Sequence, residues 1–440
     1  MNVDVAGGWL SAPVHTARLI NDPLALMRGF ARQHGPTFRL RLLDGDSLVT
    51  GDAAFIAEIF GGEEGLFDAP NEIVRPLVGD GSIVLANGAR HKRKRKLMAP
   101  PFHGARMRSY GRTIADATER AMAPFAAGDV VDVLEVTQQI SLEVILRAVF
   151  GVSDPARVEQ LRNAIVDVVA GLPAWLLFMP VLHRRMGGVG PWARYDDAVA
   201  VLRALLLEEI TRGRAAEPGS RDDVLALLLS ARDEDGQPMG DDELVDELRT
   251  LVIAGHETTA TTLAWALWEL HRNPGALERV RAAVTSSSSS SAEPEVLARV
   301  PLLVAACDET LRMHPIVPIF RRRVTRAARL GGHDLAAGTL LSPAVLITHY
   351  DDAIYAEPDE FRPERFVDRK YGATEFMPFG GGNRRCLGAA FANYELQVAL
   401  GTILRGQRFS TTSNEPLRLV MNGITTRSSG PIRLRVEARA

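Results

Sequence analysis

The sequence lacks cysteine pairs, long apolar runs and any excess of charge of one sign, and each lack excludes a class of protein. Cys307 and Cys386 are its only cysteines, too few for a disulfide scaffold or a cysteine-rich zinc module. Basic and acidic residues number 51 and 54, so the net charge of -3 indicates no nucleic-acid partner. The longest apolar run, Val168 to Leu182, is interrupted by glycine and proline and is too short to span a bilayer. We therefore expect no membrane anchor.

The remaining composition is that of a globular protein with a sizeable core. Of the 440 residues, 46% are hydrophobic and 24% are charged, which excludes a disordered chain. The first residues, MNVDVAGGWLSAP, have neither a basic segment nor a long apolar stretch, so a signal peptide is not expected. These features predict a cytoplasmic protein.

Helical periodicity dominates the middle of the chain. Apolar residues recur at three- and four-residue spacing in the windows 130–150, 193–212 and 241–272. The last window opens with Asp241, Asp242 and Glu243, which suit a helix N-terminus, and stops before Pro274. Such a helix would be roughly 48 Å long, and its residues 251–270 are apolar on nearly every side. We expect it to be buried at the centre of the molecule.

Strand-like segments are short and peripheral. Thr37 to Leu42 and Ser47 to Gly51 flank an Asp-Gly turn and predict a hairpin. The six serines from Ser286 to Ser291 predict a surface loop between helices. The fold class expected is mainly α (α+β), with one domain over residues 1–440. Its β-rich parts are expected near 36–60, 323–345 and 405–440.

The strongest chemical signal lies between Glu375 and Glu395, in the segment EFMPFGGGNRRCLGAAFANYE. Three consecutive glycines indicate a loop whose backbone passes close to another group. Cys386 follows two arginines and precedes an expected helix, a position that favours the thiolate. Because no other soft ligands cluster with it, a lone thiolate indicates one metal whose other ligands come from a macrocycle.

This segment resembles the haem-binding loop of the cytochrome P-450 family. The matching residues are Phe379, Gly382, Arg384, Cys386 and Gly388. The alternative is a buried free cysteine in a glycine-rich turn. The resemblance implies that Cys386 is the axial ligand of the haem iron and that Phe379, Arg384 and Gly388 lie against the haem.

A second motif, Ala254-Gly255-His256-Glu257-Thr258, lies within the long helix. An acid followed by an alcohol is costly in an apolar helix unless the pair faces a cavity. The Thr258 hydroxyl can also bond to a carbonyl one turn earlier and loosen the helix. A satisfied polar residue in a bent helix is the alternative. The motif resembles the oxygen-activating groove of the same family, which implies Glu257 and Thr258 as catalytic residues and Ala254 as a haem contact.

A third resemblance concerns three charged residues with a structural role. Glu309 and Arg312 are three residues apart on one helical face, and such pairs are common on solvated surfaces. Arg365, in the segment FRPERF, resembles the third member of the buried Glu-Arg-Arg cluster of the family. The role implied is to hold the segment that leads to the cysteine loop.

Three of the four lysines lie in one basic segment, Gly88 to Lys96. By itself this segment would suggest a nucleic-acid or localisation patch. The resemblance implies instead that His91 and Arg95 bind a haem propionate. The lysines are then expected on the outer surface, where an acidic electron-transfer protein docks.

Arg322 resembles a further propionate ligand of bacterial members of the family. Its neighbours Arg321 and Arg323 leave this assignment open by one residue. The segments from Pro100 to Gly111 and from Ser230 to Met239 also resemble a cyanobacterial and myxobacterial subgroup.

Together these resemblances imply the triangular, mainly helical haem-thiolate fold with a small β-rich lobe and haem b as cofactor. The implied reaction is monooxygenation of a small hydrophobic substrate (a fatty acid, terpene or polyketide) by O₂. Electrons are expected from a separate ferredoxin or flavodoxin with its reductase, since no flavin- or nicotinamide-binding domain is expected in the chain. We expect a monomer that binds no nucleic acid.

Two other functions compete with monooxygenation. One is a peroxygenase driven by hydrogen peroxide, against which the Glu257-Thr258 pair argues. The other is a non-catalytic haem-thiolate sensor or carrier, for which the 440 residues leave no output domain. For the substrate cavity, the expected walls are aliphatic and come from residues 71–83, 168–182, 251–258, 315–320 and 421–425.

Overall fold

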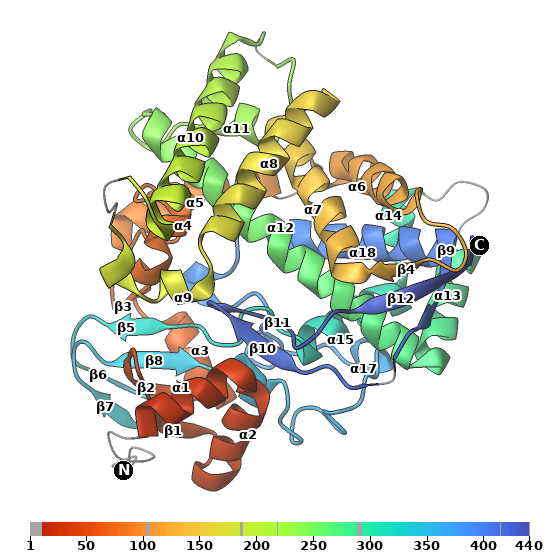
Figure 1. The fold of residues 1–440 in the computed structure, drawn as a ribbon. Coiled ribbons are helices and arrows are strands. Elements are labelled where there is room, and N and C mark those ends of the chain that lie inside the picture. Colours follow the sequence, from red (N-terminus) through yellow and green to blue (C-terminus); the bar gives the residue numbers. More distant parts are fainter. Residues whose placement is uncertain are drawn as a thin grey trace.

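The computed structural model describes residues 11–102, 106–184, 188–217, 219–287, 293–413 and 415–439. Figure 1 shows an upper and right-hand part built of helices and a lower left lobe in which short strands lie beside α1 and α2. The longer helices are α1 (Ser11–Asn21), α2 (Pro23–His34), α3 (Ala53–Gly61), α5 (Gly88–Met98), α6 (Arg106–Met122), α7 (Val133–Phe150), α8 (Pro155–Gly171), α10 (Pro191–Ala215), α11 (Val224–Ser230), α12 (Asp241–Arg272), α13 (Pro274–Ser286), α15 (Pro301–Met313) and α18 (Ala389–Gly406). The short ones are α4 (Arg75–Val78), α9 (Ala174–Leu177), α14 (Pro294–Leu297), α16 (Val345–Thr348), α17 (Glu364–Asp368) and the 3₁₀ turns η1 (Glu72–Val74), η2 (Pro100–Phe102), η3 (Pro180–Leu182) and η4 (Gly382–Arg384).

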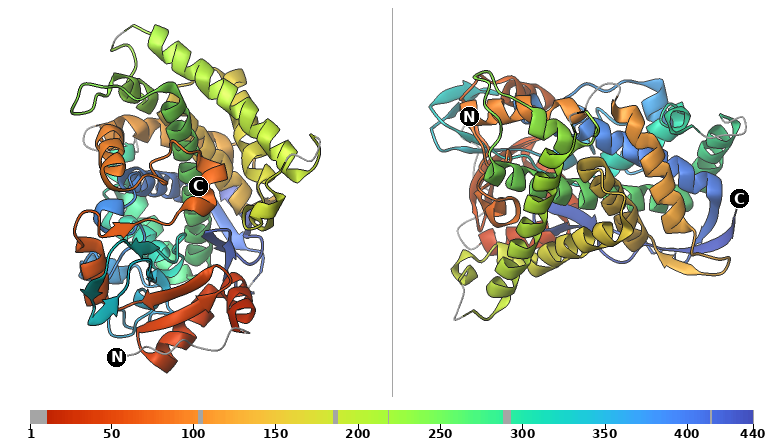
Figure 2. Two further views of the ribbon diagram at one scale, coloured as in Figure 1. Left: turned by 90° about the vertical axis from the view of Figure 1, so that its left-hand side faces the viewer. Right: turned by 90° about the horizontal axis from the view of Figure 1, so that it is seen from above.

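The long helix α12 lies at the centre, as the sequence predicts. It begins at Asp241 and ends at Arg272, before the proline that starts α13. Figure 1 shows it crossing the middle of the helical part, beside α7 and α18. Both views of Figure 2 place α8 and α10 on one side of it. No helix in the described part of the chain is long and apolar enough to cross a membrane.

Short strands form the β-rich parts. The strands are β1 (Thr37–Leu42), β2 (Gly45–Thr50), β3 (Phe67–Asp68), β4 (Val130–Asp132), β5 (Arg322–Val324), β6 (Ala328–Leu330), β7 (His333–Leu335), β8 (Leu340–Pro343), β9 (Gln407–Thr411), β10 (Leu419–Asn422), β11 (Thr425–Ser428) and β12 (Arg433–Arg439). The largest sheet has the order β1-β2-β8-β5-β3, and a smaller one has the order β4-β12-β9. Two separate hairpins, β6–β7 and β10–β11, complete the set.

The architecture confirms the mainly α fold class with small sheets. The hairpin of β1 and β2 is present, with the second strand starting two residues earlier than expected. The helix predicted from Val130 begins only at Val133, because residues 130–132 pair with β12. The Asp132 side chain then accepts a hydrogen bond from the Leu134 amide and caps α7, which sets its first turn. Of the serine tract, Ser286 ends α13 and Ser287 caps it, while residues 288–291 lie outside the described residues.

Candidate functional site

The cysteine loop folds back on itself and packs against α3. Gly380 and Gly382 have φ of +65° and +64°, a region that favours glycine. A Cβ atom at Gly382 would also lie 2.3 Å from the Phe60 carbonyl oxygen, so a side chain has no room there. The Cys386 amide donates to the Phe379 carbonyl oxygen over 2.9 Å and closes the loop. The three glycines are therefore required by the close approach that the sequence predicts.

Cys386 lies just before the first turn of α18, as expected. The Cys386 side chain is accessible to solvent, yet many protein atoms lie around it. Both observations fit a side chain at the bottom of a recess. A Cβ atom at Gly388 would meet nothing within 4 Å, so space is open beside the sulfur. Burial raises the pKa of the Cys386 thiol, while the Gly388 amide and the charges of Arg385 and Arg95 lower it. These contacts therefore act in the direction that the sequence predicts, and burial outweighs them in the chain alone.

Three guanidiniums and one imidazole face the same region from three different elements. They are Arg95 and His91 on α5, Arg322 on β5 and Arg384 in η4. In the described residues, the three guanidiniums donate to backbone carbonyls and to the Asn87 side chain but form no ion pair with a carboxylate. Burial, and then the repulsion by Arg384, lowers the pKa of Arg322 to about 10, and burial lowers that of Arg384 to about 10 against the opposing charge of Asp68. Burial, and then the three arginine charges, lower the pKa of His91 to about 4, so its ring is neutral near pH 7. The three guanidiniums form a cationic cluster, and buried or half-buried cations without a carboxylate partner are a site for an anion.

The three consecutive arginines at the start of β5, Arg321 just before it and Arg322 and Arg323 within it, have different surroundings. Arg321 pairs with Asp44 over 2.5 Å, and Arg323 pairs with Glu72 over 3.4 Å, both at the surface. Arg322 is only 8% exposed and lies within electrostatic range of His91. The geometry therefore singles out the middle arginine as the one that faces the cationic cluster.

The middle of α12 borders open space on one side. Ala254 is exposed although Val252, Ile253 and His256 around it are buried. The Thr258 hydroxyl, one turn later on the same face, donates to the Ala254 carbonyl oxygen over 2.7 Å. This is the bond that the sequence predicts, and it leaves the lone pairs of the Thr258 hydroxyl free to accept.

Glu257 points to a different neighbour from Thr258. Its carboxylate accepts from the Asn422 amide over 3.4 Å, at the end of β10. Burial raises the pKa of Glu257. The charge of Arg427 on β11 and the hydrogen bond from Asn422 oppose this effect but are smaller. Sequence reasoning placed Asn422 in the expected cavity wall, within residues 421–425, but did not identify it as the partner of Glu257, because nothing in its local pattern marks this pairing.

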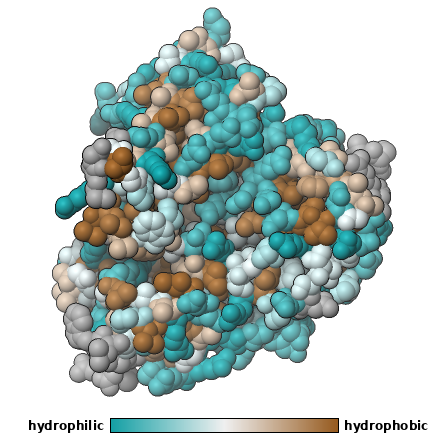
Figure 3. Space-filling model, in the orientation of Figure 1, coloured by the Kyte–Doolittle hydropathy of each residue, from teal (hydrophilic) through white to brown (hydrophobic). Residues whose placement is uncertain are grey.

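The five segments expected to line a substrate cavity lie close to one another. The Thr250 hydroxyl on α12 lies 2.8 Å from the Ser82 hydroxyl, in the loop that includes η1 and α4. The Thr426 hydroxyl donates to the Pro315 carbonyl oxygen over 2.9 Å, and a Cβ atom at Gly423 would lie 3.9 Å from Leu177. Figure 3 shows apolar surface near α9, where the exposed apolar side chains are Trp175, Phe178, Met179 and Val181.

Glu309, Arg312 and Arg365 form a buried ionic cluster, as the sequence predicts. Two Arg312 nitrogens donate to the Glu309 carboxylate over 2.7 and 2.9 Å, and the Arg365 Nε donates to it over 3.0 Å. The Glu309 and Arg312 side chains have no exposed surface. A charge cluster with this degree of burial needs all its hydrogen bonds satisfied, and the Arg362 amide supplies one more to Glu309.

The basic segment of α5 does not form a free basic surface. Lys94 is fully buried and donates to the Glu247 carboxylate over 2.9 Å, with Glu243 as its second partner. The expectation that Lys94 lies on the outer surface is therefore wrong. Lys92 and Lys96 are exposed, and each is paired with an acid. Because the segment is a helix, some of its side chains point to the interior and others to solvent. Each of its three lysines is paired with an acidic side chain.

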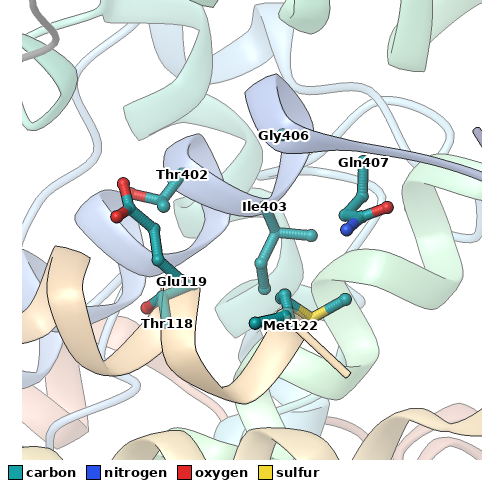
Figure 4. Close-up of a pocket in the computed structure, with 8 residues that line it drawn as sticks. Thr118, Glu119, Met122, Thr402, Ile403, Gly406 and Gln407 are labelled. Carbon is teal, nitrogen blue, oxygen red and sulfur yellow. The ribbon is translucent and has the colours of Figure 1, made fainter. Parts of the chain in front are cut away.

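A separate shallow groove lies between α6 and α18. Figure 4 shows Thr118, Glu119 and Met122 of α6 facing residues at the end of α18. This end is opposite to the one that follows Cys386, roughly 27 Å away for an 18-residue helix. The groove therefore belongs to a different part of the molecule from the recess at Cys386.

Comparison with known proteins connects this geometry to a family. The family model described as cytochrome P-450 matches residues 9–434. A cytochrome P-450 named 135B1 from Mycobacterium tuberculosis is 35% identical over 441 residues, which cover 98% of this chain and 91% of that protein. Another from the same organism, named 137, is 35% identical over 405 residues, 89% of this chain and 81% of that protein.

Two solved structures share the fold. The cyanobacterial cytochrome CYP120A1 with bound retinoic acid superposes with a TM-score of 0.83 at 24% identity, over 96% of each chain. The haem domain of a mutant cytochrome P-450 superposes with a TM-score of 0.87 at 23% identity, over 100% of this chain and 98% of that one. At these identities the likeness concerns the fold alone.

Proposed function

Because the chain belongs to the cytochrome P-450 family of haem-thiolate monooxygenases, we propose that Cys386 is the axial thiolate of a haem b and that the bound enzyme oxygenates a hydrophobic substrate. The observation that carries this assignment is the cluster of unpaired cations beside the cysteine recess. Arg95, Arg322 and Arg384 are partly or fully buried without a carboxylate partner in the described residues. The propionates of a haem are the anions that such a cluster would neutralise.

The residues of the recess suit a flat macrocycle held at its edge and through its metal. The three guanidiniums and the His91 imidazole would bind the propionates, and Cys386 would bind the iron from the side of α18. Gly388 lacks a side chain where the recess is open, and Ala254 would contact the opposite face of the haem. When bound, the haem supplies the activation of O₂ and the insertion of one oxygen atom into the substrate.

Glu257 and Thr258 would deliver protons to the oxygen side of the haem. The Thr258 hydroxyl, already donating to Ala254, can accept a hydrogen bond from a water molecule in the open space. Burial favours the neutral, proton-carrying form of Glu257, which Asn422 holds in place. A buried carboxyl group and a hydroxyl group beside the open space are the two parts of a proton relay through water.

The substrate is proposed to be a hydrophobic small molecule of the fatty acid, terpene or polyketide class. The lining segments are mostly aliphatic, and the segment of α9 and η3 exposes several apolar side chains beside them. That segment would act as a movable cover, since Gly171 and Pro173 precede α9, Pro180 begins η3, and Leu177 lies against the β10–β11 hairpin. A screen of fatty acids, terpenes and macrolides by the shift of haem absorption tests the class.

Electrons are proposed to come from a separate ferredoxin or flavodoxin with its reductase. An acidic protein docking near α5 would have to compete with Glu64 for Lys92 and with Glu234 for Lys96. Both pairs are exposed and therefore weak, so the competition costs little free energy.

Replacement of Cys386 tests the proposed function directly. The Cys386→Ser variant should lose the red-shifted absorption band that a thiolate-ligated haem gives in its reduced carbon monoxide complex. Cys307→Ser is the matched control, because Cys307 is fully buried in α15 and distant from the cationic cluster in sequence and element. If the band persists in Cys386→Ser and disappears in Cys307→Ser, the assignment is wrong.

Replacement of Thr258 separates a monooxygenase from a peroxygenase. Thr258→Ala should retain haem and substrate but yield less product per electron consumed, with hydrogen peroxide released instead. We expect a decrease in coupling near the low end of the ~10²- to 10⁴-fold effects of acid–base groups, since water can partly replace the hydroxyl. Thr262→Ala, which removes a similar back-bonded hydroxyl one turn further on, is the control. Unchanged coupling in Thr258→Ala, with efficient turnover of wild type by peroxide, would support the peroxygenase instead.

A further inference from the structure

His349 lies between the buried Glu309–Arg312–Arg365 cluster and the segment that leads to Cys386. It follows α16 directly and has no exposed surface. Its ring Nδ1 is 3.0 Å from the Arg312 carbonyl oxygen, and its Nε2 is 3.0 Å from the Met377 amide nitrogen. Both polar atoms of the ring are therefore occupied, one by the cluster and one by the cysteine loop.

The two contacts determine which nitrogen carries the proton. A backbone amide can only donate, so Nε2 must accept from Met377 and cannot be protonated. The proton is then on Nδ1, which donates to Arg312. A His349 ring that stays neutral can make both contacts at once, whereas a doubly protonated ring would lose the contact with Met377. The Arg312 guanidinium forms a second hydrogen bond between the two residues by donating to the His349 carbonyl oxygen over 2.8 Å.

Aromatic neighbours hold the ring in this orientation. Phe376 stacks on His349 with ring centroids 5.5 Å apart, and Tyr355 meets it edge-on at 6.2 Å. The Tyr355 hydroxyl donates to the Glu375 carbonyl oxygen over 3.0 Å. The backbone of residues 375–377 is therefore held at its two ends, by Tyr355 at Glu375 and by His349 at Met377.

Met377 is the point at which the cysteine loop begins. The Gly380 amide donates to the Met377 carbonyl oxygen over 3.0 Å, and the Cys386 amide donates to the Phe379 carbonyl oxygen over 2.9 Å. A continuous set of hydrogen bonds thus runs from Arg312 through His349 to Met377 and on to the turn that positions the sulfur. The first two steps join backbone to the His349 ring and the last two join backbone to backbone, so a shift of the ring moves the start of the loop.

We infer that His349 is a positioning residue that transmits the fixed geometry of the ionic cluster to the cysteine loop and so sets the place of the Cys386 sulfur. This inference rests on the proposed function only in taking Cys386 as the axial ligand. His349 touches no reacting atom and acts through Met377.

The test compares His349→Phe with His349→Gln in the haem-loaded protein. Phenylalanine keeps the ring but loses both hydrogen bonds, whereas glutamine keeps a donor and an acceptor. Hydrogen exchange of the peptide containing Met377 should be faster by roughly tenfold in His349→Phe, the effect of losing about one buried hydrogen bond. The reduced carbon monoxide complex of this variant should shift partly to the shorter-wavelength band of a haem without thiolate. His349→Gln should restore much of both signals.

His271→Phe is the matched control. His271 is also a buried histidine with a ring contact to a phenylalanine, but it bonds to Leu267 near the end of α12. Its loss should reduce overall stability without changing exchange at Met377 or the carbon monoxide band. Equal changes in His271→Phe and His349→Phe, or no change in His349→Phe, would overturn the inference.

Two further outcomes keep the inference separate from the proposed function. If wild type lacks the red-shifted band while His349→Phe still frees Met377, the haem assignment fails and the positioning role stands. If His349→Phe does not fold, the nitrogen-15 spectrum of the wild type decides. An Nε2-protonated ring at His349 could not accept from Met377, and its observation would overturn the inference.

Discussion

Arg322 has a different environment from Arg321 and Arg323, although the three are consecutive residues of the same type. Surface acids neutralise its neighbours, while Arg322 faces inward beside His91 and Arg384. Burial, and after it the repulsion by Arg384, lowers the pKa of Arg322, which is the signature of a cation that lacks its anion. At the scale of single residues, the site is defined by charges whose partner is not part of the chain.

Alanine replacement along this triplet tests that interpretation. Arg322→Ala should weaken haem retention by about ten- to a hundredfold, because hydrogen bonds to charged groups contribute roughly 1.5–3 kcal/mol. Arg321→Ala and Arg323→Ala remove only exposed ion pairs and should leave retention nearly unchanged. The measurement is the rate of haem transfer to an excess of a haem-binding acceptor protein. The same rate in all three variants would contradict the assignment of Arg322.

Two helices, α5 and α12, are joined at a buried ionic contact. Lys94 of α5 lies between Glu243 and Glu247 of α12, and the Lys94 and Glu247 side chains have no exposed surface. Burial raises the pKa of Glu247, and the charge of Lys94 is the main effect that opposes this. Because His91 and Arg95 belong to the same helix as Lys94, this contact also determines how they face the recess.

Replacement of Lys94 should therefore have a large structural effect. Lys94→Met leaves the buried Glu247 without its cation, whereas Glu243 keeps Arg93, and we expect the free energy of unfolding to fall by about 3–5 kcal/mol. Lys92→Met and Lys96→Met break exposed pairs and should cost about 0–1 kcal/mol each. Denaturant unfolding of the haem-loaded proteins measures the difference. Similar stability for all three variants would mean that the buried contact is not important for the packing of the two helices.

Across the whole molecule, buried histidines and buried carboxyls act on stability in opposite directions. Burial lowers the pKa of His256 and of His271 from 6.5 to about 4, so unfolding takes up protons below pH 6.5, and this contribution to stability falls as pH falls from 6.5 to 4. Burial raises the pKa of Glu395 from 4.5 to about 8 and that of Asp308 from 3.8 to about 7. These two carboxyls keep their protons in the fold, so their contribution to stability decreases as pH rises toward 8. The two effects oppose each other below pH 6.5, and above it only the carboxyls act, so stability should decrease from pH 6.5 to 8.

Glu395→Gln tests the alkaline side of this profile. The variant cannot lose a proton on unfolding, so the decrease in the free energy of unfolding between pH 6.5 and 8 should be smaller than in wild type. One titrating group contributes about 1.4 kcal/mol per pH unit. In His271→Phe the change of stability with pH below 6.5 should lose the positive contribution of this histidine, with little change above it. Denaturant unfolding in steps of pH gives both slopes, and identical profiles for wild type and Glu395→Gln would refute the account.

The sequence by itself determined the long central helix, the first hairpin and the glycine loop around Cys386. Each of these depends on residues near one another in the chain. The acids in the first turn of α12 and the proline after its last residue mark its two ends. The glycines of the loop indicate a close contact of the backbone, and the structure shows this contact at Phe60. Periodicity, capping and turn residues are local, so a single sequence is enough to recognise them.

Only the tertiary structure decided which polar side chains are buried and what they contact. Lys94 and Glu247 are 153 positions apart, Asn422 and Glu257 are 165 apart, and His349 and Met377 are 28 apart. The spacing of such residues in the sequence does not predict that they pair. Lys94 of α5 would be solvated if α12 did not lie beside it. The physical reason is that a buried polar group is stable only with its partner, and the fold brings that partner from another element.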